Sequence, residues 1–129
     1  MLERAREALE EALRARDRRK VVEKLISRLL GSLSPEGLRR AIEEGLDVVS
    51  LIYNHYGLAS PALLPLFRAV MRMYWREFEE VATDVEKVYR ILSKRPELRE
   101  VLESEEAKRY LNKQVENLYR TTYRLVWGD

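Results

Sequence analysis

Residues 64–92, LPLFRAVMRMYWREFEEVATDVEKVYRIL, decide the fold of this chain. Alternating steps of three and four residues through this stretch meet no polar side chain. The positions concerned are Leu64, Phe67, Met71, Tyr74, Phe78, Val81, Val85, Val88 and Leu92. This is the period of one helix face, sustained for about four heptads. At ~1.5 Å per residue the stretch predicts one continuous helix of roughly 45 Å on which the other helices pack.

This apolar seam has two interpretations. It is either the central helix of an intramolecular core or one half of a dimeric coiled coil. Aromatic residues at the core positions Phe67, Tyr74 and Phe78 suit a globular bundle better than a slim two-stranded coil. The intramolecular core is therefore the favoured interpretation.

Before the seam, residues 2–31 have the pattern of a charged helix whose apolar stripe is lost over the run RDRRK at 16–20. The helix therefore leaves the core there or breaks near Asp17, and Gly31 ends it.

A second helix is predicted from Pro35 to Tyr56. Ser34 is a suitable N-cap, and Gly57 is a stop signal. Gly45 lies on the apolar face of this predicted helix, where the absence of a side chain is expected to allow close approach of a neighbour.

After the seam, Pro96 must follow the end of the long helix, because the residue before a proline is pushed out of helical geometry. A short helix through residues 98–102 is predicted next, and then a last helix from a Ser104 cap to Gly128. Short loops make neighbouring helices antiparallel. The prediction is an all-α single domain over residues 1–129, an antiparallel helical bundle of four long helices plus one short helix.

Composition narrows the function classes. The 129 residues carry a net charge of only +2, so any argument for an anionic partner depends on where the charges lie. The lack of cysteine excludes disulfides, thiolate chemistry and cysteine-based zinc sites. No apolar run resembles a signal peptide or a membrane span, which predicts a cytoplasmic protein without a membrane partner. Abundant Glu and Arg with little Asn and Gln lean toward a thermophilic source, although a GC-rich genome would also favour Arg.

No catalytic or cofactor motif is present. His55 is the only histidine, so two-histidine metal motifs are impossible, and its place at a predicted helix end favours a structural role. Two carboxylate pairs, Glu43 with Asp47 and Glu80 with Asp84, share helix faces and have the oxygens that a hard cation needs. Solvated helix faces carry the same pattern, and that interpretation is favoured. We expect no enzyme activity, no cofactor and no metal site.

Arginine and aromatic residues recur together on three predicted helices. In the last helix the basic residues form one stripe opposite the apolar face, with Glu116 as an interruption. The candidate binding residues are Arg18, Arg19, Lys20, Arg68, Arg72, Trp75, Arg76, Arg109, Lys113, Arg120, Tyr123, Arg124 and Trp127, and Arg14 and Arg16 extend the first patch.

Arginine binds phosphate and aromatic rings stack on unpaired bases, so this combination is typical of a surface for single-stranded nucleic acid. The sequence predicts a non-enzymatic helical subunit that contacts single-stranded RNA or DNA within a nucleoprotein assembly, with the three patches forming a groove if they share a face. The alternative is a protein-interaction or structural module, in which the same aromatic residues are buried in a homo-oligomer or partner interface.

Overall fold

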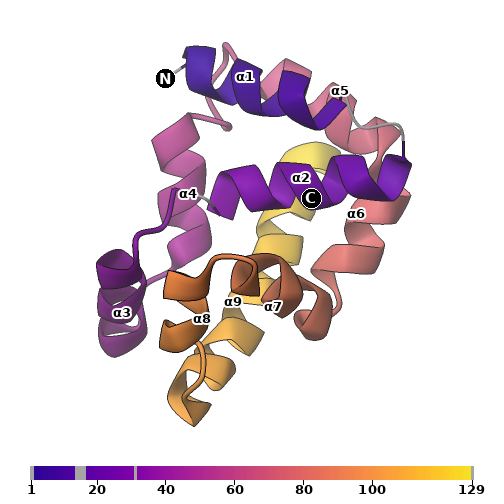
Figure 1. Cartoon of the computed structure of the whole chain (residues 1–129). Helices are drawn as coiled ribbons and strands as arrows, with labels where there is room; N and C mark the ends of the chain where they lie inside the picture. The colour runs from indigo at the N-terminus through magenta and orange to yellow at the C-terminus, as the bar shows by residue number, and fades with distance from the viewer. Residues whose placement is uncertain (1, 14–16, 31, 129) are drawn as a thin grey trace.

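The computed structural model describes residues 2–13, 17–30 and 32–128, and these ranges contain helices and no strand (Figure 1). The helices are α1 (Leu2–Leu13), α2 (Arg18–Leu30), α3 (Pro35–Glu44), α4 (Val48–Tyr56), α5 (Leu64–Met73), α6 (Trp75–Ala82), α7 (Val85–Ser93), α8 (Pro96–Val101) and α9 (Glu105–Trp127). The all-α class is confirmed for the described ranges. The predicted count of four long helices and one short one is wrong, because nine helices are present there. Arg14, Arg16 and Gly31 lie outside the described residues.

The predicted continuous helix over residues 64–92 is wrong, because the stretch forms α5, α6 and α7. The first interruption is Tyr74, with φ −113° and ψ 19°. The second precedes α7, where the Asp84 carboxylate accepts hydrogen bonds from the backbone N–H groups of Glu86 at 3.0 Å and Lys87 at 3.3 Å. A side chain that caps N–H groups in this way starts a new helix. The apolar period still identified the inner face, since none of its nine residues is exposed.

The predicted helix over residues 35–56 is also two helices, α3 and α4. Gly45 is left-handed, with φ 66° and ψ 34°, and its N–H donates to the Ala41 carbonyl, which ends α3. Asp47 then caps α4 by accepting from the N–H groups of Val49 and Ser50. The expectation that Gly45 allows close packing is wrong, because a Cβ placed there meets no atom within 4 Å.

The other predicted boundaries agree with the structure. The chain breaks at Asp17, whose side chain accepts from the Arg19 N–H at 2.9 Å. Pro96 begins α8, Ser104 caps α9 through the N–H of Ala107, and Gly128 follows the end of α9. The α5 helix begins at Leu64, next to Pro65, whose missing N–H is tolerated in a first turn.

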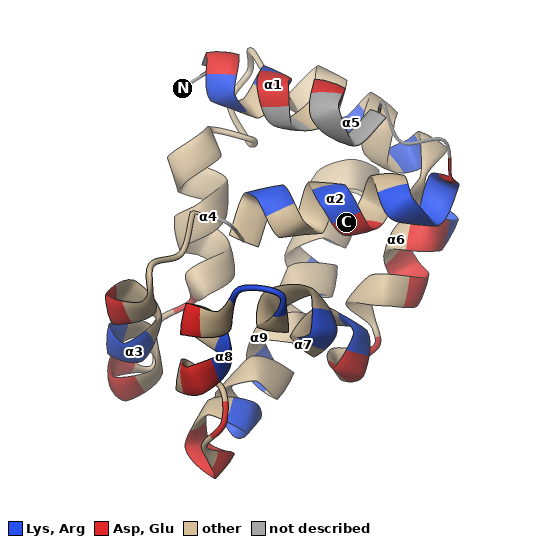
Figure 2. Cartoon of the chain, in the orientation of Figure 1, with Lys and Arg blue, Asp and Glu red and all other residues tan. Residues whose placement is uncertain are grey.

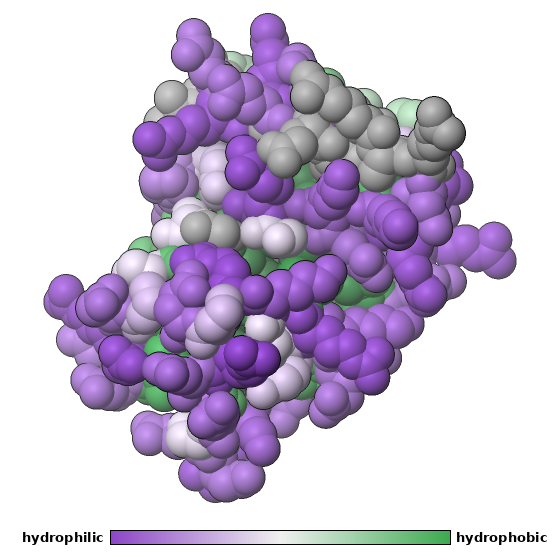
Figure 3. Space-filling model, in the orientation of Figure 1, coloured by the Kyte–Doolittle hydropathy of each residue, from purple (hydrophilic) through white to green (hydrophobic). Residues whose placement is uncertain are grey.

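The α9 helix is the element on which the rest of the fold packs. It contacts α3, α4, α5, α6 and α7 and runs behind α2 and α7 in the view of Figure 1. Its inner face contributes buried side chains along its whole length, from Ala107 to Val126, to a continuous core. Hydrophilic residues cover most of the face in Figure 3, and hydrophobic ones show mainly at its centre, below α2.

Side chains of α9 also hold the junction between α3 and α4. The Tyr110 hydroxyl donates to the Leu46 carbonyl at 2.6 Å, and Gln114 Oε1 accepts from the Val48 N–H at 3.0 Å. Val48 is the first residue of α4, where backbone N–H groups have no partner within the helix. Gln114 and Asp47 together therefore satisfy the N-terminal end of α4.

Candidate nucleic-acid interface

The outer face of α9 carries four exposed basic side chains. Arg109, Lys113, Arg120 and Arg124 lie in one stripe of a 23-residue helix, which is about 34 Å long at ~1.5 Å per residue. Within the described ranges none of the four forms an ion pair or a hydrogen bond. Glu116 lies in the same stripe and is also exposed. The positive charges of the four basic side chains are thus available to an anionic partner.

Two adjoining hollows run beside this stripe, between α9 and the α6–α7 segment. They share Val85 and Asn112. We call their combined lining the α9 groove: Glu105, Lys108, Arg109, Leu111, Asn112, Val115, Glu116, Tyr119, Arg120, Tyr123 and Arg124 of α9 with Gly128 after it, faced by Ala82, Thr83, Val85, Glu86 and Tyr89. The larger hollow measures about 1050 Å³ and the smaller about 410 Å³. Lys113 lies on the same helix face outside the lining.

The structure brings together three candidate aromatic residues from two helices. The ring of Trp75 on α6 lies 5.8 Å, centroid to centroid, from each of Tyr119, Tyr123 and Trp127 on α9. Phe78 closes this aromatic cluster on the core side, at 5.2 Å from Trp75. Trp75 is half-buried, but Tyr123 keeps 45% and Trp127 44% of its surface exposed. The ring of Tyr123 in the groove and the ring of Trp127 beside it therefore reach solvent.

Arg68 and Arg72 hold the C-terminal end of α9 in place. Arg68 Nε donates to the Leu125 carbonyl at 2.7 Å, and Arg72 donates to the Val126 carbonyl through Nη2 at 2.8 Å. These carbonyls belong to the last turn of α9, where no helical N–H is left to bind them. The Arg72 guanidinium also lies 5.1 Å from the ring centre of Trp127. Both arginines contact the helix end rather than standing free as phosphate ligands.

The first basic patch is largely paired with α6. Arg18 Nε donates to Glu77 at 2.6 Å, and Arg19 lies 3.3 Å from Glu80. The hydrogen bond from Arg18 lowers the pKa of Glu77 below its ordinary value. Figure 2 shows the blue end of α2 beside the red side of α6. In the described ranges, only Lys20 of this patch is exposed without an ion pair or hydrogen bond. Arg76 on α6 is also exposed, and its charge helps to lower the pKa of Glu77.

Tyr119 is a site residue that sequence reasoning missed. Its hydroxyl donates to Glu79 Oε2 at 2.6 Å, and this hydrogen bond, more than burial, raises the pKa of Tyr119 to about 12. The sequence feature that could have identified Tyr119 is its position four residues before Tyr123, because residues at i and i+4 are neighbours on a helix surface.

Three of the four carboxylates that were weighed as cation ligands have other roles, and the fourth, Glu43, is exposed on α3. Asp47 and Asp84 cap α4 and α7, and Glu80 pairs with Arg19. In the described ranges, no three acidic or histidine side chains gather into a possible metal site. None of the described helices is long and apolar enough to cross a membrane.

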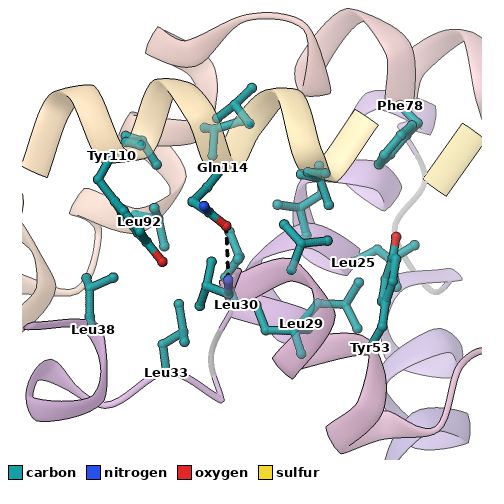
Figure 4. Close-up of a pocket in the computed structure, with 18 of the residues that line it drawn as sticks. Leu25, Leu29, Leu30, Leu33, Leu38, Tyr53, Phe78, Leu92, Tyr110 and Gln114 are labelled. Carbon is teal, nitrogen blue, oxygen red and sulfur yellow. Dashed lines mark hydrogen bonds between the residues drawn. The ribbon is translucent and has the colours of Figure 1, made fainter. Parts of the chain in front are cut away.

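The core contains a small apolar cavity of about 50 Å³ between α2, α4 and α9 (Figure 4). Leucine side chains such as Leu25, Leu29 and Leu92 surround it, and the amide of Gln114 is the main polar group directed into it. Ligand pockets usually measure about 300–1,000 Å³. This cavity is a packing defect of the core and not a ligand site.

Comparison of the chain with protein-family models, with curated proteins and with solved structures finds no match.

Proposed function

We propose that the protein binds single-stranded nucleic acid along the α9 groove as a non-enzymatic subunit of a nucleoprotein assembly. The observation that carries the proposal is the stripe of Arg109, Lys113, Arg120 and Arg124, unpaired within the described ranges, beside the exposed rings of Tyr123 and Trp127. Guanidinium groups bind phosphate oxygens in a bidentate manner, and exposed rings offer stacking surfaces to bases.

A single strand suits this groove better than a duplex. Stacking on Tyr123 or Trp127 requires the face of a base, which a duplex hides within its own stack. Within the aromatic cluster, Trp75 contacts both of these rings, and Tyr119 contacts Trp75 and Tyr123. The rings are thus held in place before a base arrives, which reduces the entropy lost on binding.

The test is fluorescence anisotropy of a labelled single-stranded oligonucleotide as a function of salt. The Arg120→Ala/Arg124→Ala variant should bind more weakly, and the slope of log affinity against log salt should fall by about 0.7 for each phosphate that is no longer neutralised. The control Arg39→Ala/Arg99→Ala removes the same charge from exposed positions outside the groove and should bind like the wild type.

Stacking is tested separately. Tyr123→Ala should lower affinity by about 1–3 kcal/mol without a change in the salt slope. Equal affinity of the wild type and the double arginine variant, or no binding even at low salt, would refute the proposal.

A second candidate function, self-association, is favoured by the outer face of α5. Leu66 and Met73 are 40% and 60% exposed there, and Ala62 and Ala69 are exposed beside them. On α5 itself, Leu66, Ala69 and Met73 follow spacings of three and four residues and form a short apolar seam, and Ala62 lies just before the helix begins. In an antiparallel pair the large residues of one copy meet the small residues of the other, so the face is complementary to itself.

Self-association is tested by light scattering coupled to size-exclusion chromatography. If α5 joins two copies, the wild type should elute as a dimer and Leu66→Glu as a folded monomer. Leu51→Glu is the control, because Leu51 is 52% exposed on a different helix, α4. A wild type that is monomeric at high concentration would contradict this function.

A further inference from the structure

A polar hollow of about 510 Å³ lies apart from the α9 groove, where α1, α2, α4 and the α7–α8 loop meet. The lining consists of Arg4, Glu7, Ser27, Arg28, Ser32, His55, Tyr56 and Arg95. None of these residues lines the α9 groove. The hollow therefore gathers three arginines and the only histidine from segments that are distant in the sequence.

The helix ends that border this hollow are already satisfied by hydroxyl groups. The Tyr56 hydroxyl donates to the Arg28 carbonyl at 2.9 Å, and Ser32 Oγ donates to the Leu29 carbonyl at 3.0 Å. These bonds occupy carbonyl groups of the last turn of α2, which would otherwise attract the basic side chains.

The charged groups that face the hollow are mostly positive. Among the described residues of the lining, Glu7 is the only acidic one. Arg28 and Arg95 already have partners, and Arg95 Nε donates to Glu97, outside the lining, at 3.0 Å. A guanidinium has five N–H donors, so an arginine that is already paired keeps donors for a further ligand. The part of the lining that the structure describes thus offers arginine and imidazole donors from all four segments, opposed by the carboxylate of Glu7.

From this arrangement we infer that the hollow is a binding site for a phosphate monoester group. Such a group carries a charge near −2 and three acceptor oxygens, which suits donors that converge from several directions. The arginines bind these oxygens through charge-assisted hydrogen bonds, and a ring N–H of His55 is a further donor. The inference goes beyond the α9 groove, because it needs no residue of that groove.

Proton NMR of the His55 imidazole provides a direct test, because a single histidine gives one set of ring signals. The pH is held constant throughout the measurement. Inorganic phosphate, added at constant ionic strength against chloride, should shift these signals along a saturable curve. Arg4→Gln should weaken the apparent affinity by about tenfold, whereas Arg6→Gln, an exposed control on α1 outside the hollow, should leave it unchanged.

A shift that is linear in phosphate, or one that Arg4→Gln does not alter, would overturn the inference. Two further titrations separate the sources of the phosphate. A nucleoside monophosphate tests a free nucleotide, and a 5′-phosphorylated oligonucleotide, compared with its 5′-hydroxyl form, tests a nucleic-acid end. The Arg120→Ala/Arg124→Ala variant should keep the full phosphate response, so the two proposals fail independently.

Discussion

At the scale of single residues, one hydrogen bond in the core joins two helices. The hydroxyl groups of Tyr53 on α4 and Thr122 on α9 bind each other, and Thr122 is fully buried while Tyr53 is 5% exposed. Burial raises the pKa of Tyr53 well above its ordinary value, so the phenol stays protonated. The pair is a buried polar contact between α4 and α9, like that of Gln114 with the Val48 N–H, and a buried group that loses its partner is costly.

Thr122→Val should therefore lower the free energy of unfolding by about 1–3 kcal/mol, because it leaves the Tyr53 hydroxyl buried without a partner. Urea denaturation followed by circular dichroism measures this change. The Tyr53→Phe/Thr122→Val variant removes both hydroxyls and should recover part of the loss. If the losses of unfolding free energy in Thr122→Val and Tyr53→Phe simply add up in the double variant, the two hydroxyls are not coupled.

Two other tyrosines predict a loss of stability at high pH. Burial raises the pKa of Tyr110 to about 12, and the hydrogen bond to Glu79 raises that of Tyr119 to about 12. A phenol whose pKa is higher in the folded protein than in the unfolded chain stabilises the fold. This contribution is complete below the pKa in the unfolded chain, about 10, and is lost as pH rises to the pKa in the folded protein. The free energy of unfolding should thus decrease between pH 10 and pH 12. In Tyr110→Phe/Tyr119→Phe the decrease should be smaller, and an equal decrease would contradict the assignment.

At the scale of helices, the apolar period and the caps carry different information. The period over residues 64–92 correctly identified the side of the chain that is buried, because it depends only on local spacing. It did not show where the helices end. The sequence pattern placed Asp84 and Asp47 on the faces of continuous predicted helices. Only the structure shows that their carboxylates bind backbone N–H groups at the start of α7 and α4. Gly45 was the available stop signal for α3, and its positive φ explains why.

Asp47→Ala tests the N-cap of α4. The substitution removes an acceptor for the N–H groups of Val49 and Ser50 and should reduce the free energy of unfolding by about 1–2 kcal/mol. Glu43→Ala, at an exposed position of α3, should change it by less than about 0.5 kcal/mol. The midpoint of thermal unfolding is then measured for Asp47→Ala and Glu43→Ala with and without Mg²⁺. The difference between the two midpoints should be the same in both conditions. A difference that changes when Mg²⁺ is added would support the cation-site interpretation.

At the scale of the whole molecule, the predicted site was only partly accessible to sequence reasoning. The basic stripe of α9 follows from helical spacing alone, and it was predicted correctly as one face. The partners of Arg18 and Arg68 were not predictable, because Glu77 and the Leu125 carbonyl are 59 and 57 residues away in the chain. Sequence spacing describes one helix at a time, so contacts between helices decide which arginines remain available.

The continuous core predicts cooperative unfolding of the whole chain. Tryptophan fluorescence reports on the aromatic cluster, and circular dichroism reports on all helices. Because both depend on the same core, their urea transitions should have the same midpoint. Separate midpoints would mean that part of the chain, such as α1 with α2, unfolds on its own, and would contradict the single-domain prediction.

The position of α9 in the chain has a consequence for biosynthesis. A ribosome adds about 5–20 residues per second, so the 23 residues of α9 emerge over roughly 1–5 s, after every other described helix. Until then, the faces of α4, α5, α6 and α7 that α9 covers have nothing to pack against. The nascent chain therefore spends this interval with its apolar surfaces open, and its yield in the cell should depend on chaperones that shield them.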